Sequence, residues 1–293
     1  MQKYIEALRE YMKKDYREMY REKGGVFPYG FLTPGSASYP DTLWDWDSYF
    51  SNVALKQILV DVGADPKEAQ EYERGCVLNF LSFTDGDGFM PVAVMRRTKR
   101  ENMRPANVYH ENMHKPILAQ HAAFLVRQDG DAEWLRDGFD KLRYHINNYM
   151  NHHKHKPTGL YYWQTDKMIG VDNDPCTFYR PDASSASIYL NCLMVKELEA
   201  MAYLSEKLGM PEAGKVYQEE RDRLIAAIRE HCYDERDGFF YNVDINLRAI
   251  DFEAEPFYHK GMPRHWDCLI QRIDVWSGFM ALWAGVATPE QAA

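Results

Sequence analysis

The sequence predicts an all-α fold, an (α/α)6 toroid or barrel of which this chain holds an incomplete set of helices. Two observations predict it. Eight segments carry apolar residues at helical spacing, and a glycine followed by large apolar residues recurs between them, at Gly88, Gly159 and Gly238. Each of these glycines follows a pair of helical segments, so a unit of two helices and a short extended loop is repeated. The alternative is an irregular helical protein in which the glycine turns coincide by chance.

The helices are expected, in chain order, at residues 2–22, 47–62, 67–82, 116–128, 132–153, 183–208, 212–231 and 272–285. The first repeats Tyr4, Leu8 and Tyr11 on one face, and the Gly- and Pro-rich stretch after it must be irregular. Asp182 is the expected N-cap of the helix over 183–208, and Gly209 its expected C-terminal stop.

The last residues predict one more helix start. Thr288, Pro289 and Gln291 occupy the N-cap, first and third positions of a capping box, yet only two alanines follow. A toroid of six hairpins also needs more helices than the eight expected here. We therefore expect residues 1–293 to be a single catalytic domain truncated at its C-terminus, about the first two-thirds of a barrel.

Composition narrows the class of protein. The chain is 45% hydrophobic and 27% charged, as globular proteins are, and its net charge of -9 argues against a nucleic-acid surface. The basic run at 96–100 is expected to be a solvated loop.

The sequence also bears on the compartment of the protein. No apolar run is long enough to span a membrane, and the N-terminus lacks the apolar centre of a secretory signal. Five cysteines without a CxxC pair predict neither disulfides nor zinc, and therefore a cytoplasmic protein.

Tryptophans and aspartates alternate at Trp44, Asp45, Trp46 and Asp47, just before a predicted helix. Sugar rings have apolar faces that stack on indole rings and hydroxyl rims that bond carboxylates. This pattern therefore favours a carbohydrate site. The structural alternative is that Asp47 is a helix cap and the tryptophans belong to the core.

Two further segments carry similar chemistry. Residues 170–175 pack two carboxylates and an amide between Gly170 and Pro175, shortly after the aromatic Tyr162 and Trp163. An ordinary Asx turn or a calcium loop are the alternatives, although the EF-hand spacing is absent. Residues 107–124 offer Tyr109, His110, Asn112, His114 and Gln120. His110 and His114 have the spacing of a helical metal site, but Pro116 disfavours a helix there, so hydrogen bonding to a polar ligand is preferred. Arg272, Asp274 and Trp276 lie at the start of another predicted helix.

Taken in order, these motifs resemble the catalytic region of glycoside hydrolase family sixty-three and its trehalase-like relatives, which are inverting α-glycosidases on an (α/α)6 barrel. The resemblance rests on Trp44–Ser48, Asn112–Pro116, Gly170–Pro175 and the helix after Asp182, and it runs from about residue 25 to the end. The short N-terminus is similar to that of smaller bacterial members, which act on α-glucosides or α-mannosides, including glycosylglycerates.

The resemblance implies roles for individual residues. Asp172 would be the general acid, and the general base would be a glutamate beyond residue 293. Asp174 stands where a serine is common, which leaves substrate choice open. From the motifs and the resemblance together we expect no metal or cofactor, a small carbohydrate as partner, and substrate-binding side chains at Trp44, Asp45, Trp46, Asp47, Tyr109, His110, Asn112, Gln120, Tyr162, Trp163, Asn173 and Trp276.

Three rival functions remain: a sugar epimerase on the same toroid, a non-catalytic carbohydrate-binding toroid, and a purely structural helical repeat. Epimerases of this fold use histidines as acid and base, whereas the carboxylates at 170–175 suit a hydrolase better. A toroid that lacks several helices leaves apolar faces uncovered. We therefore expect residues 1–293 alone to be inactive and poorly soluble.

Overall fold

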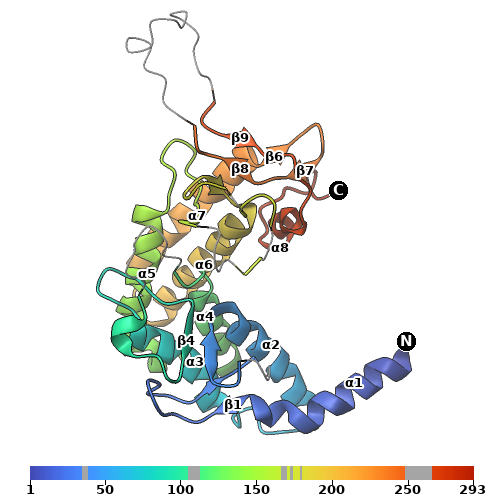
Figure 1. Cartoon of the computed structure of the whole chain (residues 1–293), viewed down its shortest axis with the longest axis vertical. Helices are drawn as coiled ribbons and strands as arrows, with labels where there is room; N and C mark the ends of the chain where they lie inside the picture. Colours follow the sequence, from blue (N-terminus) through green and yellow to red (C-terminus); the bar gives the residue numbers. More distant parts are fainter. Residues whose placement is uncertain (35–38, 105–112, 166–169, 172–173, 179, 248–265) are drawn as a thin grey trace, which may run out of the picture. The chain divides into compact units, whose positions relative to one another are not determined.

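The computed structural model describes residues 1–34, 39–104, 113–165, 170–171, 174–178, 180–247 and 266–293. Within these ranges α-helices dominate and every strand has only two or three residues, which confirms the predicted all-α class (Figure 1). Contacts divide the chain into two compact units. Unit 1 lies within residues 1–106, 113–148 and 200–215, and unit 2 within residues 149–199 and 216–293.

Unit 1 is built mainly from α1 (Gln2–Asp15), α2 (Asp45–Val62), α3 (Gln70–Phe83), α4 (Leu118–Asp129) and most of α5 (Phe139–His152), with 3-10 helices η1 (Tyr16–Met19), η2 (Arg100–Asn102) and η4 (Glu133–Gly138). The small residues Ala119, Ala122 and Ala123 are fully buried on α4, which lets neighbouring helices pack closely. None of the residues of α1 is buried, and Figure 1 shows this helix projecting from the rest of unit 1.

Two short antiparallel ribbons lead the chain to the first residues of interest. Strand β1 (Tyr20–Arg21) pairs with β2 (Phe31–Leu32), and β3 (Thr42–Trp44) pairs with β4 (Ala93–Met95). In the second ribbon Trp44 lies opposite Ala93. Because α2 begins at the residue after β3, this ribbon fixes where the helix starts.

Helix α3 approaches the backbone before β2 very closely. A Cβ atom on Gly75 would lie 1.8 Å from the carbonyl oxygen of Gly30. The same face of α3 bonds this segment: the Leu32 N–H donates to Cys76 Sγ at 3.2 Å, and the Asn79 amide receives the Tyr29 N–H at 3.2 Å and donates to the Tyr29 carbonyl at 3.1 Å. Glycine at position 75 is therefore what allows the contact.

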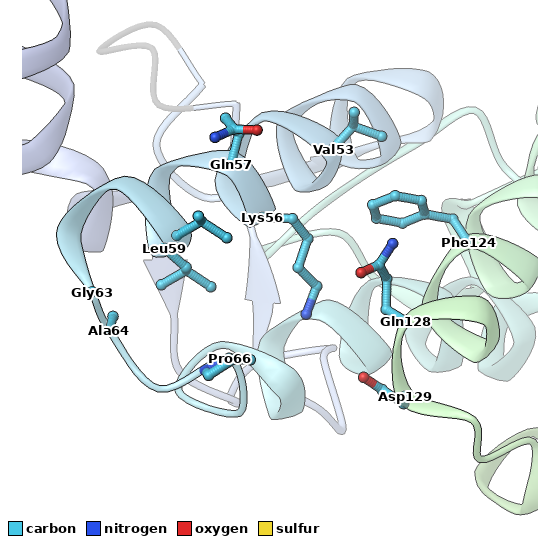
Figure 2. A pocket seen from close by; sticks show the side chains of 11 residues that line it. Val53, Lys56, Gln57, Leu59, Gly63, Ala64, Pro66, Phe124, Gln128 and Asp129 are labelled. Carbon is cyan, nitrogen blue, oxygen red and sulfur yellow. The ribbon is translucent and has the colours of Figure 1, made fainter.

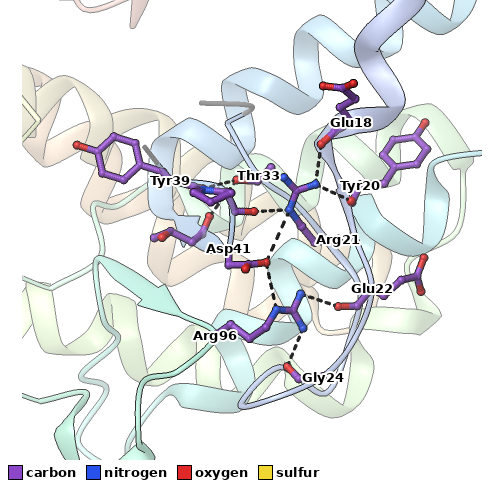
Figure 3. A network of polar contacts seen from close by, with 11 residues as sticks. Glu18, Tyr20, Arg21, Glu22, Gly24, Thr33, Tyr39, Asp41 and Arg96 are labelled. Carbon is purple, nitrogen blue, oxygen red and sulfur yellow. Dashed lines mark hydrogen bonds and ion pairs between the residues drawn. The ribbon is translucent and has the colours of Figure 1, made fainter. Parts of the chain in front are cut away.

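Two arginines hold the irregular N-terminal segment in place, and one of them, Arg96, directly follows β4 (Figure 3). Arg96 donates from Nε to Asp41 Oδ1 at 3.2 Å and from its other nitrogens to the carbonyls of Gly24 and Glu22. Arg21 bonds the carbonyls of Glu18, Tyr20 and Pro40. The prediction that residues 96–100 form a merely solvated loop is therefore wrong for Arg96, because its guanidinium donates to Asp41 and to two backbone carbonyls.

Unit 2 contains most of α6 (Ile188–Lys207), most of α7 (Pro211–His231), the 3-10 helix η5 (Trp276–Phe279) and α8 (Met280–Trp283). Strands β5 (Ser185–Ala186), β8 (Val243–Asp244) and β9 (Leu269–Ile270) form an antiparallel sheet, and β6 (Tyr233–Asp234) pairs with β7 (Phe239–Phe240). The loop before α6 is fixed to α7 by a buried network. Tyr161 Oη donates to Glu220 Oε1 at 2.6 Å, and Lys154 Nζ donates to the same oxygen at 2.5 Å.

The predicted turns and stops are largely confirmed. Gly88, Gly159, Gly209 and Gly238 all have positive φ, between 65° and 86°, a conformation that favours glycine. Thr288 and Gln291 form the predicted capping box, since each backbone N–H donates to the other's side chain, at 3.1 and 3.2 Å. The Ala292 N–H also bonds the Thr288 carbonyl, which closes one helical turn.

Several helix ends differ from the prediction. The first helix ends at Asp15 rather than at residue 22, because η1 and β1 follow it. Helix α6 begins at Ile188, so Asp182 does not cap it; residues 185–186 pair as β5 instead. Helix α2 begins at Asp45 with Trp44 as its N-cap, so Asp47 lies inside the first turn and is not the cap.

A groove of about 480 Å³ lies between α2 and α4 within unit 1 (Figure 2). Its charged groups already have partners: Lys56 Nζ lies 2.6 Å from Glu73 Oε2, and Asp129 accepts from Gln70 and Arg74. Val53, Val60 and Phe124 give the remaining wall an apolar character. The groove is therefore an uncovered helix face.

All five cysteines are free thiols, and four of them are buried. Among the described residues, no helix combines the length and the apolar character needed to cross a bilayer.

Candidate active site

The Trp-Asp-Trp-Asp segment lies where β3 gives way to α2 in unit 1. The Asp45 N–H donates to the Val92 carbonyl at 3.0 Å, which continues the β3–β4 pairing by one residue. The four side chains therefore leave a backbone that is held on both sides: by a ribbon before it and by a helix after it.

Trp44 has a buried polar atom for which the described part of the chain offers no hydrogen-bond partner. Its ring meets Tyr39 edge-on with centroids 5.6 Å apart. Its indole Nε1 is buried and has no acceptor among the described residues. A buried hydrogen-bond donor without an acceptor is rare in native proteins, so this N–H is a candidate to bond a ligand or a water.

Asp45 is 1% exposed, and both of its oxygens are occupied. Lys115 Nζ lies 3.0 and 2.9 Å from Oδ1 and Oδ2, and the Lys115 backbone N–H donates to Oδ2 at 3.1 Å. Burial alone would raise the pKa of Asp45, but the charge and hydrogen bonds of Lys115 lower it overall. The prediction that Asp45 contacts sugar directly does not fit this geometry; Asp45 supports its neighbours.

Trp46 and Asp47 remain partly accessible beside that pair. The Trp46 N–H donates to Asp45 Oδ1 at 2.7 Å, and Lys115 Nζ lies 5.3 Å from the Trp46 ring centroid. Burial raises the pKa of Asp47, and the nearby charge of Asp45 raises it further. One aromatic face and one carboxylate thus lie together, which suits a sugar ring and its hydroxyls.

His114, just before α4, and Gln120, in its first turn, are both buried. His114 is fully buried, with Nδ1 2.7 Å from the Lys115 carbonyl oxygen and its ring edge-on to Phe80, and burial lowers its pKa to about 4. Gln120 is 6% exposed and its Nε2 donates to the Pro116 carbonyl at 2.9 Å. These contacts give His114 and Gln120 structural partners within unit 1.

Aromatic rings gather in unit 2. Tyr189 lies between Trp163, at a centroid distance of 6.4 Å, and Trp276, at 5.7 Å. Trp163 is 5% exposed and its buried indole Nε1 has no acceptor among the described residues, whereas Trp276 is 52% exposed. Tyr162 does not join them, because its hydroxyl donates to the His152 carbonyl at 3.0 Å. The structure therefore brings together two of the three predicted aromatic residues.

The described part of the carboxylate loop is a tight turn. Gly170 has φ 82°, and Asp174 closes an Asx turn by accepting the Cys176 N–H at 2.9 Å. The Phe178 N–H donates to the Asp174 carbonyl at 2.7 Å. Asp174 therefore builds the turn, which was the structural alternative for this motif. Asp172 and Asn173 lie outside the described residues, as do Tyr109, His110 and Asn112.

The sheet behind this loop holds polar residues that sequence reasoning missed. Ser185 Oγ donates to the Cys176 carbonyl at 2.9 Å, and Asn242 Oδ1 accepts the Ile188 N–H at 2.7 Å. Thr177 Oγ1 and Ser187 Oγ are buried and have no partner among the described residues. No motif marked them, because their proximity arises from the β5–β8–β9 pairing of distant segments.

A cleft of about 840 Å³ in unit 2 is lined by Trp276, Phe279, Tyr241, Asp274 and Arg272, among others. Tyr241 Oη donates to Asp274 Oδ1 at 3.1 Å, and Arg272 bonds Asp234 and Asp237. The cleft therefore combines exposed rings with an ordered polar network. This arrangement places the predicted Arg272, Asp274 and Trp276 together.

Comparison with known proteins points to one class. The profile of the mannosylglycerate hydrolase MGH1-like glycoside hydrolase domain matches residues 39–293. The structure is similar to the GH63 mannosylglycerate hydrolase of Thermus thermophilus solved with glucose, at 18% identity and a TM-score of 0.63, covering 96% of this chain and 73% of that one. It is also similar to the neutral trehalase Nth1 of Saccharomyces cerevisiae, at 17% identity and a TM-score of 0.60, covering 90% of this chain and 54% of that one. No curated protein sequence matches.

Proposed function

The chain belongs to the mannosylglycerate hydrolase MGH1-like glycoside hydrolase family and has the fold of (α/α)6 glycosidases, and from this we propose that it is an inverting α-glycosidase. The proposed substrate is an α-glucoside or α-mannoside of small size, such as a glycosylglycerate. Solved relatives carry glucose, or Tris with D-glycerate, which supports a small sugar-acid substrate.

The observation that carries the proposal is the pair of buried indole donors. Trp44 and Trp163 each keep a buried N–H without an acceptor among the described residues, and each lies in a predicted sugar-binding motif. A sugar hydroxyl supplies the acceptor that the indole lacks, while the ring packs against the sugar's apolar face. A purely structural helical repeat leaves both donors unexplained.

In the proposed reaction Asp172 protonates the leaving glycosidic oxygen. A second carboxylate activates a water on the opposite face of the sugar, and the two carboxyl groups of inverting enzymes are roughly 6.5–9.5 Å apart. The acid must stay protonated near neutral pH, which burial or a neighbouring negative charge achieves. Asp174, two residues away and 5% exposed, is such a neighbour.

The general base is proposed to be a glutamate that residues 1–293 do not supply. The family resemblance puts this residue near the end of the catalytic domain, and the chain matches 73% of the Thermus hydrolase. Uncovered apolar side chains on α2 and η5, with Phe50 at 48%, Val60 at 71% and Phe279 at 62% exposure, support a barrel completed by further helices. Residues 1–293 alone are therefore expected to be inactive and prone to association. The free thiols support a reducing, cytoplasmic setting.

The test is hydrolysis by the protein expressed from its complete reading frame. Glucosylglycerate, mannosylglycerate and trehalose are offered, and proton NMR follows the first-formed anomer. With either glycosylglycerate, release of the β-anomer of the sugar supports inversion and release of the α-anomer contradicts it. Trehalose tests cleavage alone, because its leaving group is itself an α-glucose. Epimerisation without cleavage would favour the epimerase, and binding without turnover the carbohydrate-binding toroid.

Two variants distinguish the proposed acid, Asp172, from Asp174, which builds the turn of the same loop. Asp172→Asn is expected to abolish turnover while leaving the unfolding midpoint unchanged. Asp174→Asn is the matched control, because an asparagine oxygen can still accept the Cys176 N–H. It should keep turnover and move the alkaline limb of the pH profile to lower pH, since a negative charge beside the acid is lost. Turnover by Asp172→Asn would remove Asp172 from the role.

A further inference from the structure

Asp45 and Lys115 form a fully buried ion pair behind the accessible residues of the unit 1 site. Their side chains are 0% and 2% exposed, and the ammonium lies within 3.0 Å of both carboxylate oxygens. Backbone N–H groups of Lys115 and Trp46 add two more bonds to the carboxylate, at 3.1 and 2.7 Å. Four donated contacts hold one side chain.

Stability alone is a poor reason for such a pair. Removing two charges from water costs about as much as their attraction returns, and well-packed apolar residues often serve equally well in the same space. What a buried pair does provide is geometry, because its hydrogen bonds are satisfied in only one arrangement. The relevant question is therefore which groups the pair orients.

The pair joins two segments that are distant in the chain. Asp45 begins α2, and Lys115 lies just before α4. Through Asp45 the pair fixes the Trp46 peptide, and through Lys115 it puts a cation 5.3 Å from the centroid of the Trp46 ring, within cation–π range. Asp47 follows one residue later on the same helical turn. The pair thus contacts Trp46 directly, and its two charges both act on Asp47.

We propose that the Asp45–Lys115 pair is a positioning device that sets the Trp46 ring and the Asp47 carboxylate for a sugar, and that Lys115 is a positioning residue which does not itself touch the substrate. This assignment rests on the proposed glycosidase function. It gives Asp45 a role different from direct contact with hydroxyls, and it gives Lys115 a role that no motif predicted.

The experiment uses the protein from its complete reading frame and compares Lys115→Met, Asp45→Asn and the double variant. The matched control is Asn79→Ala, which removes a buried polar contact of unit 1 far from the pair in sequence and leaves the motif intact. Glucose affinity is measured by calorimetry. The ¹⁹F resonance of 5-fluorotryptophan at position 46, assigned with Trp46→Phe, reports the ring's surroundings without needing activity.

Each single variant is expected to weaken glucose binding about tenfold or more and to shift the Trp46 resonance, whereas Asn79→Ala does neither even if it lowers the urea midpoint. Because the two residues act as a unit, the double variant should lose no more glucose affinity than the worse single variant.

A further test is the pH dependence of glucose binding, which should shift in opposite directions in the two single variants. Of the two charges that act on Asp47, Asp45 raises its pKa and Lys115 lowers it, so Asp45→Asn and Lys115→Met should move the pKa in opposite directions.

The experiment distinguishes failure of the positioning role from failure of the proposed glycosidase function. Wild-type protein that binds glucose with an affinity unchanged in the variants overturns the positioning role alone. An unmoved Trp46 resonance in Lys115→Met also overturns it, whatever the substrate. Wild-type protein that neither binds glucose nor cleaves any offered glycoside overturns the proposed function, and the positioning role falls with it.

Discussion

Replacing Gly75 with alanine should lower the free energy of unfolding of unit 1. The loss should exceed that from the same change at any other helical glycine of unit 1 whose φ lies outside the left-handed region. The new Cβ would lie 1.8 Å from the Gly30 carbonyl oxygen and 2.9 Å from its carbon. Real Cβ atoms essentially never come closer than 3.0 Å to such neighbours. Both contact atoms belong to backbone, so no side-chain rotation can relieve the clash.

The magnitude follows from what must move. Separating α3 from the segment before β2 by more than an ångström places the change at the upper end of overpacking costs, about 3 kcal/mol. It also weakens the bonds from Cys76 and Asn79, which together contribute about 1–2 kcal/mol. Alanine's better helix propensity offsets about 1 kcal/mol. The expected loss of unfolding free energy is therefore about 3–4 kcal/mol.

Urea unfolding followed by circular dichroism measures the loss. Gly86→Ala is the matched control, since no heavy atom lies within 4 Å of its Cβ position and its φ is not in the left-handed region. That control should change stability by less than about 1 kcal/mol, in the stabilising direction if at all. If Gly75→Ala proves as harmless as Gly86→Ala, the close approach of α3 to Gly30 is not as described.

Two further predictions concern buried titratable groups. Burial lowers the pKa of His114 and His153 to about 4 and that of His121 to about 3, below the ordinary 6.5 of an unfolded chain. The unfolded state therefore binds more protons in this window, and stability should fall as pH drops from about 6.5 to about 4, by up to about 1.4 kcal/mol per pH unit for each histidine; constant urea midpoints across that window would contradict this. Tyr161→Phe removes the 2.6 Å hydrogen bond to buried Glu220 and should cost about 1–2 kcal/mol, whereas Tyr11→Phe, at a tyrosine that is 67% exposed, should cost nothing measurable by the same assay.

Periodicity predicted α2 to α7 well, because it reports which face of a segment is buried. It was less informative for α1, none of whose residues is buried, and for residues 272–285, where the structure has only η5 and the four-residue α8. Glycine turns were equally legible, since a positive φ leaves few other choices. Helix starts were less so. Asp182 resembles a cap, but pairing of β5 with β8 delays α6 until Ile188, and that pairing depends on residues almost 60 positions away. Local signals do not record such partners.

In the candidate site, too, local residue types were informative, whereas contacts between distant segments could not be read from the sequence. The sequence pattern predicted Trp44, Trp46 and Asp47 as sugar-binding residues from their chemistry, and the structure leaves Trp46 and Asp47 partly accessible. It assigned Asp45 the same role as Asp47, because the two are indistinguishable in a Trp-Asp repeat. Only the position of Lys115 separates them. Arg96 illustrates the same difficulty, since its basic neighbours suggested solvent while Asp41 and two carbonyls hold it.

The capping box at Thr288 and Gln291 has a consequence for whatever follows it along a polypeptide. Starting a helix is costly, because several residues must be fixed before the first hydrogen bond forms. Here that step is already complete: the Ala292 N–H is bonded to the Thr288 carbonyl, and both cap donors are satisfied. Residues joined after Ala293 would therefore enter a helix at the propagation stage, and even a short peptide of modest helical propensity, appended there, should be helical where it would be a coil when free in solution.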